Sequence, residues 1–206
     1  MKIERIVNSF LQSNTFILSQ NEEDTVYVVD IGDINPVLEL IGPKRVKGLF
    51  LTHAHYDHIY GINTLLATFP ECIVYGSKQS FNALKNDKLN FSYYYDTPLQ
   101  YQGGTEIVME DGQMVALWKG SNSIQAFITP GHTHGSTCYI TGNNIFTGDA
   151  YIPNISPVTK LKEGNKIEAM KSIEAIKARI LEGIVIHPGH LTQYKMINGT
   201  LKSLEY

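Results

Sequence analysis

The sequence has little of what marks secreted, membrane-spanning or nucleic-acid-binding proteins. It contains 2 cysteines in 206 residues, too few for a disulfide framework. No apolar run approaches the roughly 20 residues that span a bilayer, and the charged start is unlike a signal peptide. The formal net charge of -3 gives no basic surface for nucleic acid or anionic lipid. We therefore expect neither a nucleic acid nor a membrane partner, and we expect a cytoplasmic location.

Tandem repeats, low-complexity tracts and linkers are also missing, and the prolines and glycines are spread along the chain as punctuation. Hydrophobic residues make up 43% and charged residues 18%, which is ordinary for a folded globular protein. The length allows a substantial core. The sequence thus predicts one domain over residues 1–206. Cys72 and Cys138 lie in apolar segments and are expected to be buried, reduced thiols, the alternative being a disulfide between them.

Strand-like and helix-like segments alternate along the chain. Runs of β-branched and aromatic residues predict an antiparallel meander at its start. Asn35 and Pro36 predict the N-cap and first residue of a short helix that ends at Gly42. The expected elements are strands at 3–7, 15–18, 25–29, 46–51, 73–75 and 184–186, further strands between 105 and 147, and helices at 61–69 and 78–84.

The clearest helical pattern lies near the end of the chain. Asn165 and Glu168 have capping-box spacing. The order of meander, helix, strand and helix, then a second meander, helix and strand, predicts two sheets facing each other with helices outside. The expected fold class is α/β, in four layers. The helix itself carries one apolar stripe: Ile167, Met170, Ile173, Ile176 and Ile180.

All 7 histidines fall into three clusters, each of which follows a predicted strand. The strongest cluster is THAHYDH at residues 52–58, at the carboxyl end of a buried strand, where ligand sites of α/β sheets lie. Residues two apart in an extended loop point the same way, so His53 and His55 are placed to grip one ion. Asp57 and His58, where the chain turns into a helix, are placed to hold a second ion. The alternative is a solvated turn rich in these residue types.

Two further motifs present an imidazole after a Pro-Gly pair, which fixes the backbone and removes bulk. They are PGH at His132 and PGH at His190. Asp149 follows a strand and a glycine in the same manner. Alone it would indicate only a turn. Beside three histidine clusters, its two oxygens are expected to bridge two cations.

The ordered motifs THAHYDH, PGHTH, GD and PGH resemble those of the metallo-β-lactamase-fold hydrolases, and the likeness runs from residue 29 to residue 190. The resemblance implies an αββα sandwich of two mixed sheets, with helices on the outer faces and metals at one edge. It also implies the ligands: a first metal on His53, His55 and His132, a second on Asp57, His58 and His190, and Asp149 bridging both.

Three other residues near these motifs are given separate roles. His134 is expected to contact a ligand or the substrate rather than a metal. His187 is expected to make a structural hydrogen bond. Asp30, at the end of an early strand, is expected to orient a ligand imidazole.

Two groups of side chains outside the ligand set have two interpretations each. Phe91 and the tyrosines at 93–95 form either an apolar lip over the metals or ordinary core packing. Lys160 and Lys162 either meet an acidic group of the substrate or are solvated loop residues.

Imidazole nitrogen with carboxylate oxygen suits Zn²⁺, two ions per chain, with Fe or Mn in the same ligands left open. Such ions lower the pKa of a bound water to about 7, so a metal-bound hydroxide would attack a small-molecule substrate at neutral pH. Asp57, His55 and Asp149 are therefore expected to be essential for catalysis. No Gly-x-Ser-x-Gly elbow is present, and neither cysteine has a histidine close in sequence, so no competing nucleophile is found.

Among these hydrolases, the chain length and the PGHTHGS and HPGH motifs look most like the glyoxalase II-type thioesterases, which hydrolyse hydroxyacyl-glutathione. That likeness implies an ester-type substrate, above all a thioester. The chain ends soon after His190, without the helical region that helps to bind glutathione, and residues 150–157 depart from the usual pattern, so glutathione itself is not implied. The alternatives are a mononuclear iron persulfide dioxygenase, a lactonase and a metal-binding module without catalysis. The oligomeric state is left open.

Overall fold

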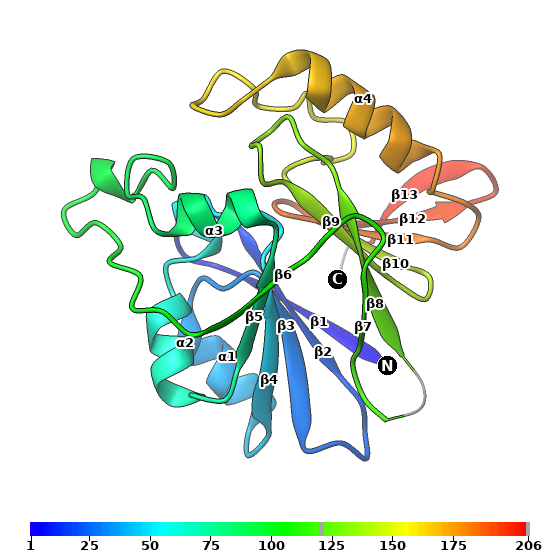
Figure 1. Ribbon diagram of the computed structural model, residues 1–206. Coiled ribbons are helices and arrows are strands. Elements are labelled where there is room, and N and C mark those ends of the chain that lie inside the picture. Colours follow the sequence, from blue (N-terminus) through cyan, green and yellow to red (C-terminus); the bar gives the residue numbers. More distant parts are fainter. Residues whose placement is uncertain (120–121, 205–206) are drawn as a thin grey trace. The chain divides into compact units, whose positions relative to one another are not determined.

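The computed structural model describes residues 1–119 and 122–204, which divide into two compact units, each built on one β-sheet (Figure 1). Unit 1 runs from Met1 to Met109, and unit 2 begins at Glu110 and contains the remaining described residues. The single domain expected over 1–206 stays a prediction, and its positions 120–121 and 205–206 lie outside the described residues.

Unit 1 contains a six-stranded mixed sheet. Its strands are β1 (Lys2–Val7), β2 (Asn14–Ser19), β3 (Thr25–Val29), β4 (Arg45–Phe50), β5 (Ile73–Gly76) and β6 (Thr105–Val108). They lie side by side in that order. Strands β1 to β3 form the antiparallel meander that the sequence predicts, and β3 to β6 are parallel. Because parallel strands share a direction, the carboxyl ends of β3 and β4 lie at the same edge of this sheet.

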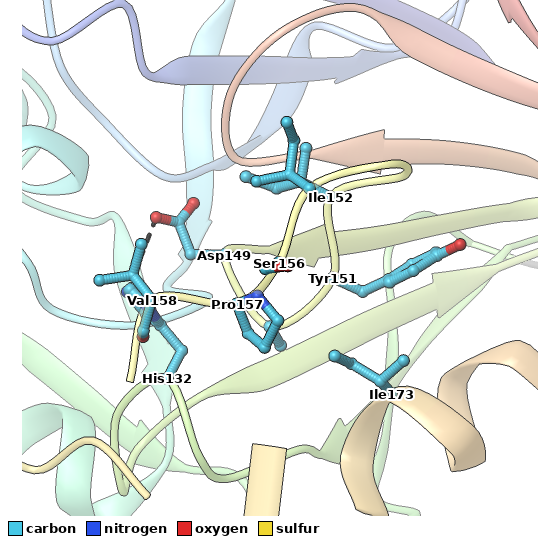
Figure 2. Close-up of a pocket in the computed structure, with 10 residues that line it drawn as sticks. His132, Asp149, Tyr151, Ile152, Ser156, Pro157, Val158 and Ile173 are labelled. Atoms are coloured by element: carbon cyan, nitrogen blue, oxygen red, sulfur yellow. Dashed lines mark hydrogen bonds and ion pairs between the residues drawn. The ribbon is translucent and has the colours of Figure 1, made fainter. Parts of the chain in front are cut away.

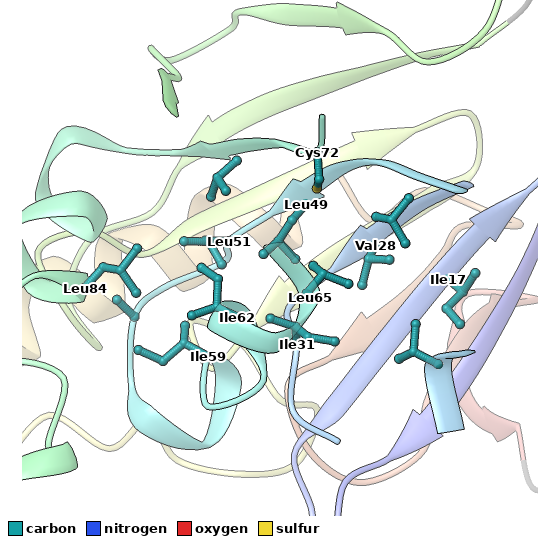
Figure 3. Packing of buried hydrophobic residues seen from close by; sticks show 14 of the residues in the cluster. Ile17, Val28, Ile31, Leu49, Leu51, Ile59, Ile62, Leu65, Cys72 and Leu84 are labelled. Carbon is teal, nitrogen blue, oxygen red and sulfur yellow. The ribbon is translucent and has the colours of Figure 1, made fainter. Parts of the chain in front are cut away.

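Three helices connect the parallel strands of unit 1: α1 (Ile34–Ile41), α2 (Ile62–Thr68) and α3 (Lys78–Leu84). They pack on one face of the sheet, where strand residues such as Val28 and Leu49 meet helix residues such as Ile62 and Leu65 (Figure 3). These four side chains are fully buried. Each such burial contributes about 1.5–3 kcal/mol relative to an exposed side chain. The edge of the sheet that carries the first histidine cluster therefore rests on a packed core.

Helix α1 begins earlier than the sequence pattern predicts. Its N-cap is Asp33 rather than Asn35, and Pro36 lies inside the first turn. Proline is tolerated there because the first N–H groups of a helix have no partner within it. The Asp33 carboxylate makes no cap hydrogen bond and instead accepts hydrogen bonds from Ser9 and Tyr60. Tertiary contacts of Asp33 therefore decide where the helix starts.

Unit 2 contains a seven-stranded mixed sheet. Its strands are β7 (Met114–Ala116), β8 (Ser123–Ile128), β9 (Thr137–Thr141), β10 (Asn144–Gly148), β11 (Val185–Pro188), β12 (Gln193–Ile197) and β13 (Thr200–Leu204). The spatial order is β13-β12-β11-β10-β9-β8-β7. Strands β10 and β11 are parallel, and the other pairs are antiparallel. As a result β8, β10 and β11 run in one direction, and their carboxyl ends lie at one edge of this sheet.

Helix α4 (Lys166–Lys177) connects β10 to β11. The Asn165 side chain accepts hydrogen bonds from the backbone N–H groups of Ile167 and Glu168, at 3.0 and 3.2 Å, which confirms the predicted N-cap. The N–H of Asn165 itself donates to the carbonyl of Gly131 at 2.8 Å. The start of α4 is thus fastened to the loop that carries the second histidine cluster.

Only part of the predicted apolar stripe of α4 is buried. Ile173, Ile176 and Ile180 pack into the core of unit 2. Ile167 is 70% exposed and Met170 is 45% exposed. The buried face of the helix is formed by Ala169, Ser172, Ile173 and Ile176, so Ile167 and Met170 lie off this face, and Ile180 lies beyond the end of the helix.

The hairpin of β12 and β13 is not among the predicted strands. Its turn is Asn198 and Gly199, both with positive φ (52° and 71°), and Ile197 pairs with Thr200 across it. An Asn-Gly pair between short strands is the strongest local signal for a two-residue hairpin. That signal could have revealed these two strands.

The cysteines and the lengths of the helices can be read directly from the structure. Cys72 and Cys138 are free and buried, so the alternative of a disulfide between them is wrong. In the part of the chain that the structure describes, no helix has the length and apolar character needed to cross a membrane.

Candidate metal centre

The first histidine cluster lies directly after β4, in a short loop that leads into the 3-10 helix η1 (Tyr56–His58). The predicted ligands His53, His55, Asp57 and His58 are all buried. The ring centroid of His53 lies 4.7 Å from that of His55 and 4.3 Å from that of His58. Asp57 Oδ2 lies 3.4 Å from His58 Nε2. Unit 1 therefore brings its four predicted ligands together.

Asp30 organises two of these imidazoles from the end of the neighbouring strand β3. Its carboxylate accepts hydrogen bonds from the N–H of Thr52 at 2.8 Å, from Thr52 Oγ1 at 2.6 Å and from His58 Nδ1 at 2.9 Å. The Thr52 hydroxyl donates to Asp30, so it accepts from His53 Nδ1, which lies 3.1 Å away. The expected contact of Asp30 with an imidazole is confirmed. Its role toward a metal stays a prediction.

The same contacts define the charge state and the tautomers of this group. Burial raises the pKa of the Asp30 carboxyl, and hydrogen bonds from His58 and Thr52 act in the opposite direction. Three donors converge on this carboxylate, which is what a buried anion requires. Because Nδ1 of His53 and of His58 carries the donated proton, the Nε2 atoms are the nitrogens with lone pairs for a metal.

Two residues outside the motif hold the backbone of the ligand loop. Ser13 Oγ donates to the carbonyl of Asp57 at 2.6 Å, and the N–H of Tyr56 donates to the carbonyl of Asn90 at 2.8 Å. Ser13 and Asn90 are fully buried. Sequence reasoning missed both, because a serine or an asparagine far away along the chain carries no local signal of such a role.

Unit 2 brings its three predicted ligands to the edge where β8, β10 and β11 end. His132 Nε2 lies 3.6 Å and His190 Nε2 lies 3.5 Å from Asp149 Oδ2. His132 Nδ1 donates to the carbonyl of Val158 at 2.9 Å. This imidazole is therefore oriented in the same way as His53 and His58, with Nδ1 bound to the protein and Nε2 turned toward the predicted ligand Asp149.

The glycine before His132 is required by the packing of the loop. Gly131 has φ 131°, and a Cβ at this position would lie 2.1 Å from the backbone nitrogen of Ala169. Ser172 Oγ also donates to the carbonyl of Pro130 at 2.7 Å. The Pro-Gly pair thus lets the loop lie directly against helix α4, which fixes the position from which His132 projects.

Figure 2 shows a pocket of unit 2 beside His132 and Asp149. Apart from these two residues and Ser156, its lining is apolar, and it comes mainly from the segment 150–158, with Ile173 of helix α4. The pocket places an apolar wall next to the predicted bridging carboxylate.

The two remaining histidines differ in their surroundings. His187 Nε2 lies 2.9 Å from Asn144 Oδ1, and Gln193 Nε2 lies 2.7 Å from His187 Nδ1, which confirms the expected structural hydrogen bond. Burial lowers the pKa of His187 to about 3, so the ring is neutral. His134 is 54% exposed at its side chain and lies 3.7 Å from a Glu163 oxygen. Its contact with substrate stays a prediction.

The aromatic and lysine groups with two interpretations are also placed. Lys160 and Lys162 are exposed, and a role toward substrate stays a prediction. The ring of Phe91 lies edge-on to His55, at 4.9 Å between centroids. The tyrosines at 93–95 are 52%, 71% and 38% exposed, which excludes ordinary core packing for them.

The chemistry of these donors fits a divalent metal. Each unit offers imidazole nitrogens together with a carboxylate, the combination that zinc and iron sites use. Three imidazoles are also hydrogen-bonded to the protein through Nδ1 in the manner of metal-binding histidines.

Comparisons with known sequences give the same family on most of the chain. The profile of the Metallo-beta-lactamase superfamily matches residues 8–190. A hydroxyacylglutathione hydrolase of Citrobacter koseri is 32% identical over 169 residues, which are 81% of this chain and 58% of that protein. One of Salmonella arizonae is 32% identical over 167 residues, 80% of this chain and 57% of that protein. The chain thus spans less than two thirds of these relatives.

Solved structures show the fold. The chain resembles the crystal structure of the BLEG-1 B3 metallo-beta-lactamase with a TM-score of 0.83 and 23% identity, over 93% of both chains. It resembles ETHE1 from Myxococcus xanthus with a TM-score of 0.73 and 21% identity, over 98% of this chain and 80% of the other. Together with two mixed sheets and their helices, this likeness confirms the α/β sandwich class expected from the sequence.

Proposed function

Because the chain belongs to the metallo-β-lactamase superfamily, we propose that it is a metal-dependent hydrolase of a small ester-type substrate, most specifically a thioester. The observation that carries the proposal is the preorganisation of the imidazoles. His58 is held by Asp30, His53 by Thr52, and His132 by the carbonyl of Val158, each through Nδ1. A protein that only buries histidines has no need to present three of them with the same nitrogen turned outward.

We propose that the two sets of ligands serve one centre of two zinc ions. His53, His55 and His132 would hold one ion. Asp57, His58 and His190 would hold the other, with Asp149 between them. This assignment follows the order of the family's motifs and the donor types present here.

The metals would supply Lewis acidity, lowering the pKa of a bound water and stabilising negative charge that develops on the substrate. The residues of the chain have separate tasks. Asp57 is buried beside His58 and would accept a proton from the attacking water and orient it. Asp149 would offset the positive charge of the centre, and the apolar wall of the adjoining pocket would keep bulk water away from the reacting carbonyl.

The thioester class is supported by the curated relatives, which are named as hydroxyacylglutathione hydrolases. The apolar pocket walls of the segment 150–158 fit a small apolar group better than a charged tripeptide such as glutathione. We therefore propose a small-molecule substrate, with no nucleic acid or membrane partner. The free, buried thiols fit a reducing compartment, and we propose the cytoplasm.

The test is a metal analysis of the purified full chain combined with a panel of thioesters, lactones, oxygen esters and phosphodiesters. We expect two zinc equivalents per chain and the highest kcat/KM on a thioester. His55→Ala and Asp149→Asn should abolish turnover while circular dichroism shows the fold retained. Asp24→Asn removes an exposed carboxylate and serves as the matched control, with unchanged turnover.

Two outcomes would contradict the proposal. Full activity of a His55→Ala sample whose metal content has been verified would refute the ligand assignment. One iron per chain, with oxygen consumed in the presence of a persulfide and no thioester cleaved, would replace hydrolysis by the dioxygenase alternative.

A further inference from the structure

The segment from Asn90 to Tyr95 has an unusual backbone next to the first ligand loop. Phe91 has φ 64°, in the left-handed region that bulky residues rarely adopt. Asn90 enforces this conformation: it is fully buried, donates to the carbonyl of Leu84 at 3.2 Å and accepts from the N–H of Ser92 at 2.9 Å. A strained backbone conformation of this kind is kept only where surrounding contacts hold it in place, and such conformations are most common at functional sites.

The segment is fastened to the ligand loop on both sides of Phe91. Before it, the N–H of Tyr56 donates to the carbonyl of Asn90. After it, the ring of Tyr95 stacks on the ring of Tyr56, with 5.1 Å between centroids and 24° between planes. Phe10 packs edge-on against both rings, at 5.5 and 4.9 Å. Tyr56 lies between the predicted ligands His55 and Asp57 in the sequence, so these contacts fix the position of the segment relative to both ligands.

Three rings of this segment form a continuous surface that begins at a predicted metal ligand. Phe91 lies edge-on to His55 at 4.9 Å, Tyr94 stacks on Phe91 at 6.1 Å with 24° between planes, and Tyr93 lies edge-on to Tyr94 at 5.5 Å. Tyr94 is 71% exposed and Tyr93 is 52% exposed. We call Phe91, Tyr94 and Tyr93 the aromatic strip. It leads from a buried imidazole to solvent.

We propose that the aromatic strip determines substrate specificity by binding a flat apolar acyl group, such as a phenylacetyl group, attached to the carbonyl that is cleaved. This inference rests on the proposed function, because the strip starts at His55. Its first ring touches that imidazole, so the group it binds must begin close to the scissile bond. A phenyl ring binds exposed, fixed aromatic rings of a protein by offset stacking or by edge-to-face contact.

The first test compares kcat/KM for thioesters that place a phenyl ring on different sides of the sulfur. We expect the phenylacetyl thioester of a small thiol to be cleaved about tenfold better than the acetyl thioester, because one good aromatic contact contributes that order of discrimination. The acetyl thioester of benzyl thiol should show no such gain. Tyr94→Ala should reduce the phenylacetyl preference several-fold. Leu181→Ala, which removes another exposed apolar side chain, should leave it unchanged.

The second test does not need turnover. Phenylacetate and acetate are titrated into the zinc-loaded chain with ¹³C-labelled aromatic rings, and the ring signals of Phe91 and Tyr94 are followed by NMR. We expect phenylacetate to shift both signals and acetate to shift neither. Tyr94→Ala should weaken the phenylacetate titration, whereas Leu181→Ala should not.

The two tests separate failure of the inference from failure of the proposed function. Equal cleavage of acetyl and phenylacetyl thioesters, with no shift of the strip signals, overturns the inference and leaves hydrolysis standing. A preference for the benzyl thiol ester also overturns it, because the apolar site would then lie on the leaving-group side. No cleavage of any ester, with the strip signals shifted by phenylacetate alone, refutes the hydrolase and retains an aryl-binding strip.

Discussion

Replacing Asp30 by asparagine tests the central physical claim about the candidate site, which is that a buried carboxylate sets the tautomer of a ligand imidazole. The carboxylate accepts three hydrogen bonds, two from Thr52 and one from His58 Nδ1. An amide has one oxygen and one NH₂ group. The oxygen can still accept from the N–H of Thr52, and the NH₂ group then faces the Thr52 hydroxyl and the imidazole.

The cost of Asp30→Asn should fall mainly on His58. The Thr52 hydroxyl can accept a hydrogen bond from the new amide, whereas His58 Nδ1 can do so only if its proton moves to Nε2. That shift places a proton on the nitrogen that would bind the metal. A hydrogen bond to a charged group contributes about 1.5–3 kcal/mol. Zinc affinity should therefore fall by about 10- to 100-fold, the range usual for loss of such a carboxylate partner.

The assay for Asp30→Asn is competition for zinc against a chelator of known affinity, with the His58 tautomer read from long-range ¹⁵N NMR of the metal-free chain. Asp24→Asn, which changes an exposed carboxylate, is the control and should match the wild type. The reasoning is refuted if Asp30→Asn binds zinc within twofold of the wild type while His58 keeps its proton on Nδ1.

Three further changes probe the scaffold. Gly131→Ala should lower the free energy of unfolding in urea by several kcal/mol, because the new Cβ overlaps the backbone of Ala169. Gly142 also has a positive φ but lies in open space, so Gly142→Ala should lower it by only about 1–2 kcal/mol. Equal losses for the two variants would contradict this. His187→Phe should flatten the pH dependence of stability. Burial lowers the pKa of His187 in the folded chain to about 3, whereas the same imidazole in the unfolded chain takes up a proton below about pH 6.5. The free energy of unfolding of the wild type therefore decreases as the pH falls from about 6.5 to about 3, by up to about 1.4 kcal/mol per pH unit. Identical slopes for the wild type and the variant would refute this. Cys72→Ser and Cys138→Ser should spare turnover and lower only stability, because burial raises both thiol pKa values to about 12; thiol-reagent labelling of the native chain would contradict this.

Some features of the chain follow from local pattern, and the structure confirms them. Strand β3 at 25–29 and helix α3 at 78–84 occur at the predicted residues, because hydrophobic period and capping residues are local properties. The gathering of ligands within each unit is predictable for a related reason. His53, Asp149 and His190 each follow a strand directly, and the carboxyl ends of strands that run in one direction meet at one edge of a sheet.

The helix start at Asp33 and the exposed Ile167 show where local pattern fails. Asp33 has the chemistry of an N-cap but uses its carboxylate on Ser9 and Tyr60. Ile167 is part of the predicted apolar stripe of α4, but the buried face of the helix is formed by Ala169, Ser172, Ile173 and Ile176, and Ile167 is 70% exposed. For Asp33, contacts with distant parts of the chain outweigh a local capping preference of about 1 kcal/mol.

The sequence by itself determined which residues are the candidate metal ligands, since imidazoles and carboxylates cluster at adjacent positions that follow strands. Only the tertiary structure decided how they are aimed. Thr52 links His53 to Asp30 by hydrogen bonds, and Ser13 holds the carbonyl of Asp57. The backbone carbonyl of Val158 orients the imidazole of His132, and a backbone oxygen has no sequence signature. A hydrogen bond between residues far apart along the chain depends on the folded positions of both partners, and no spacing in a single sequence encodes that.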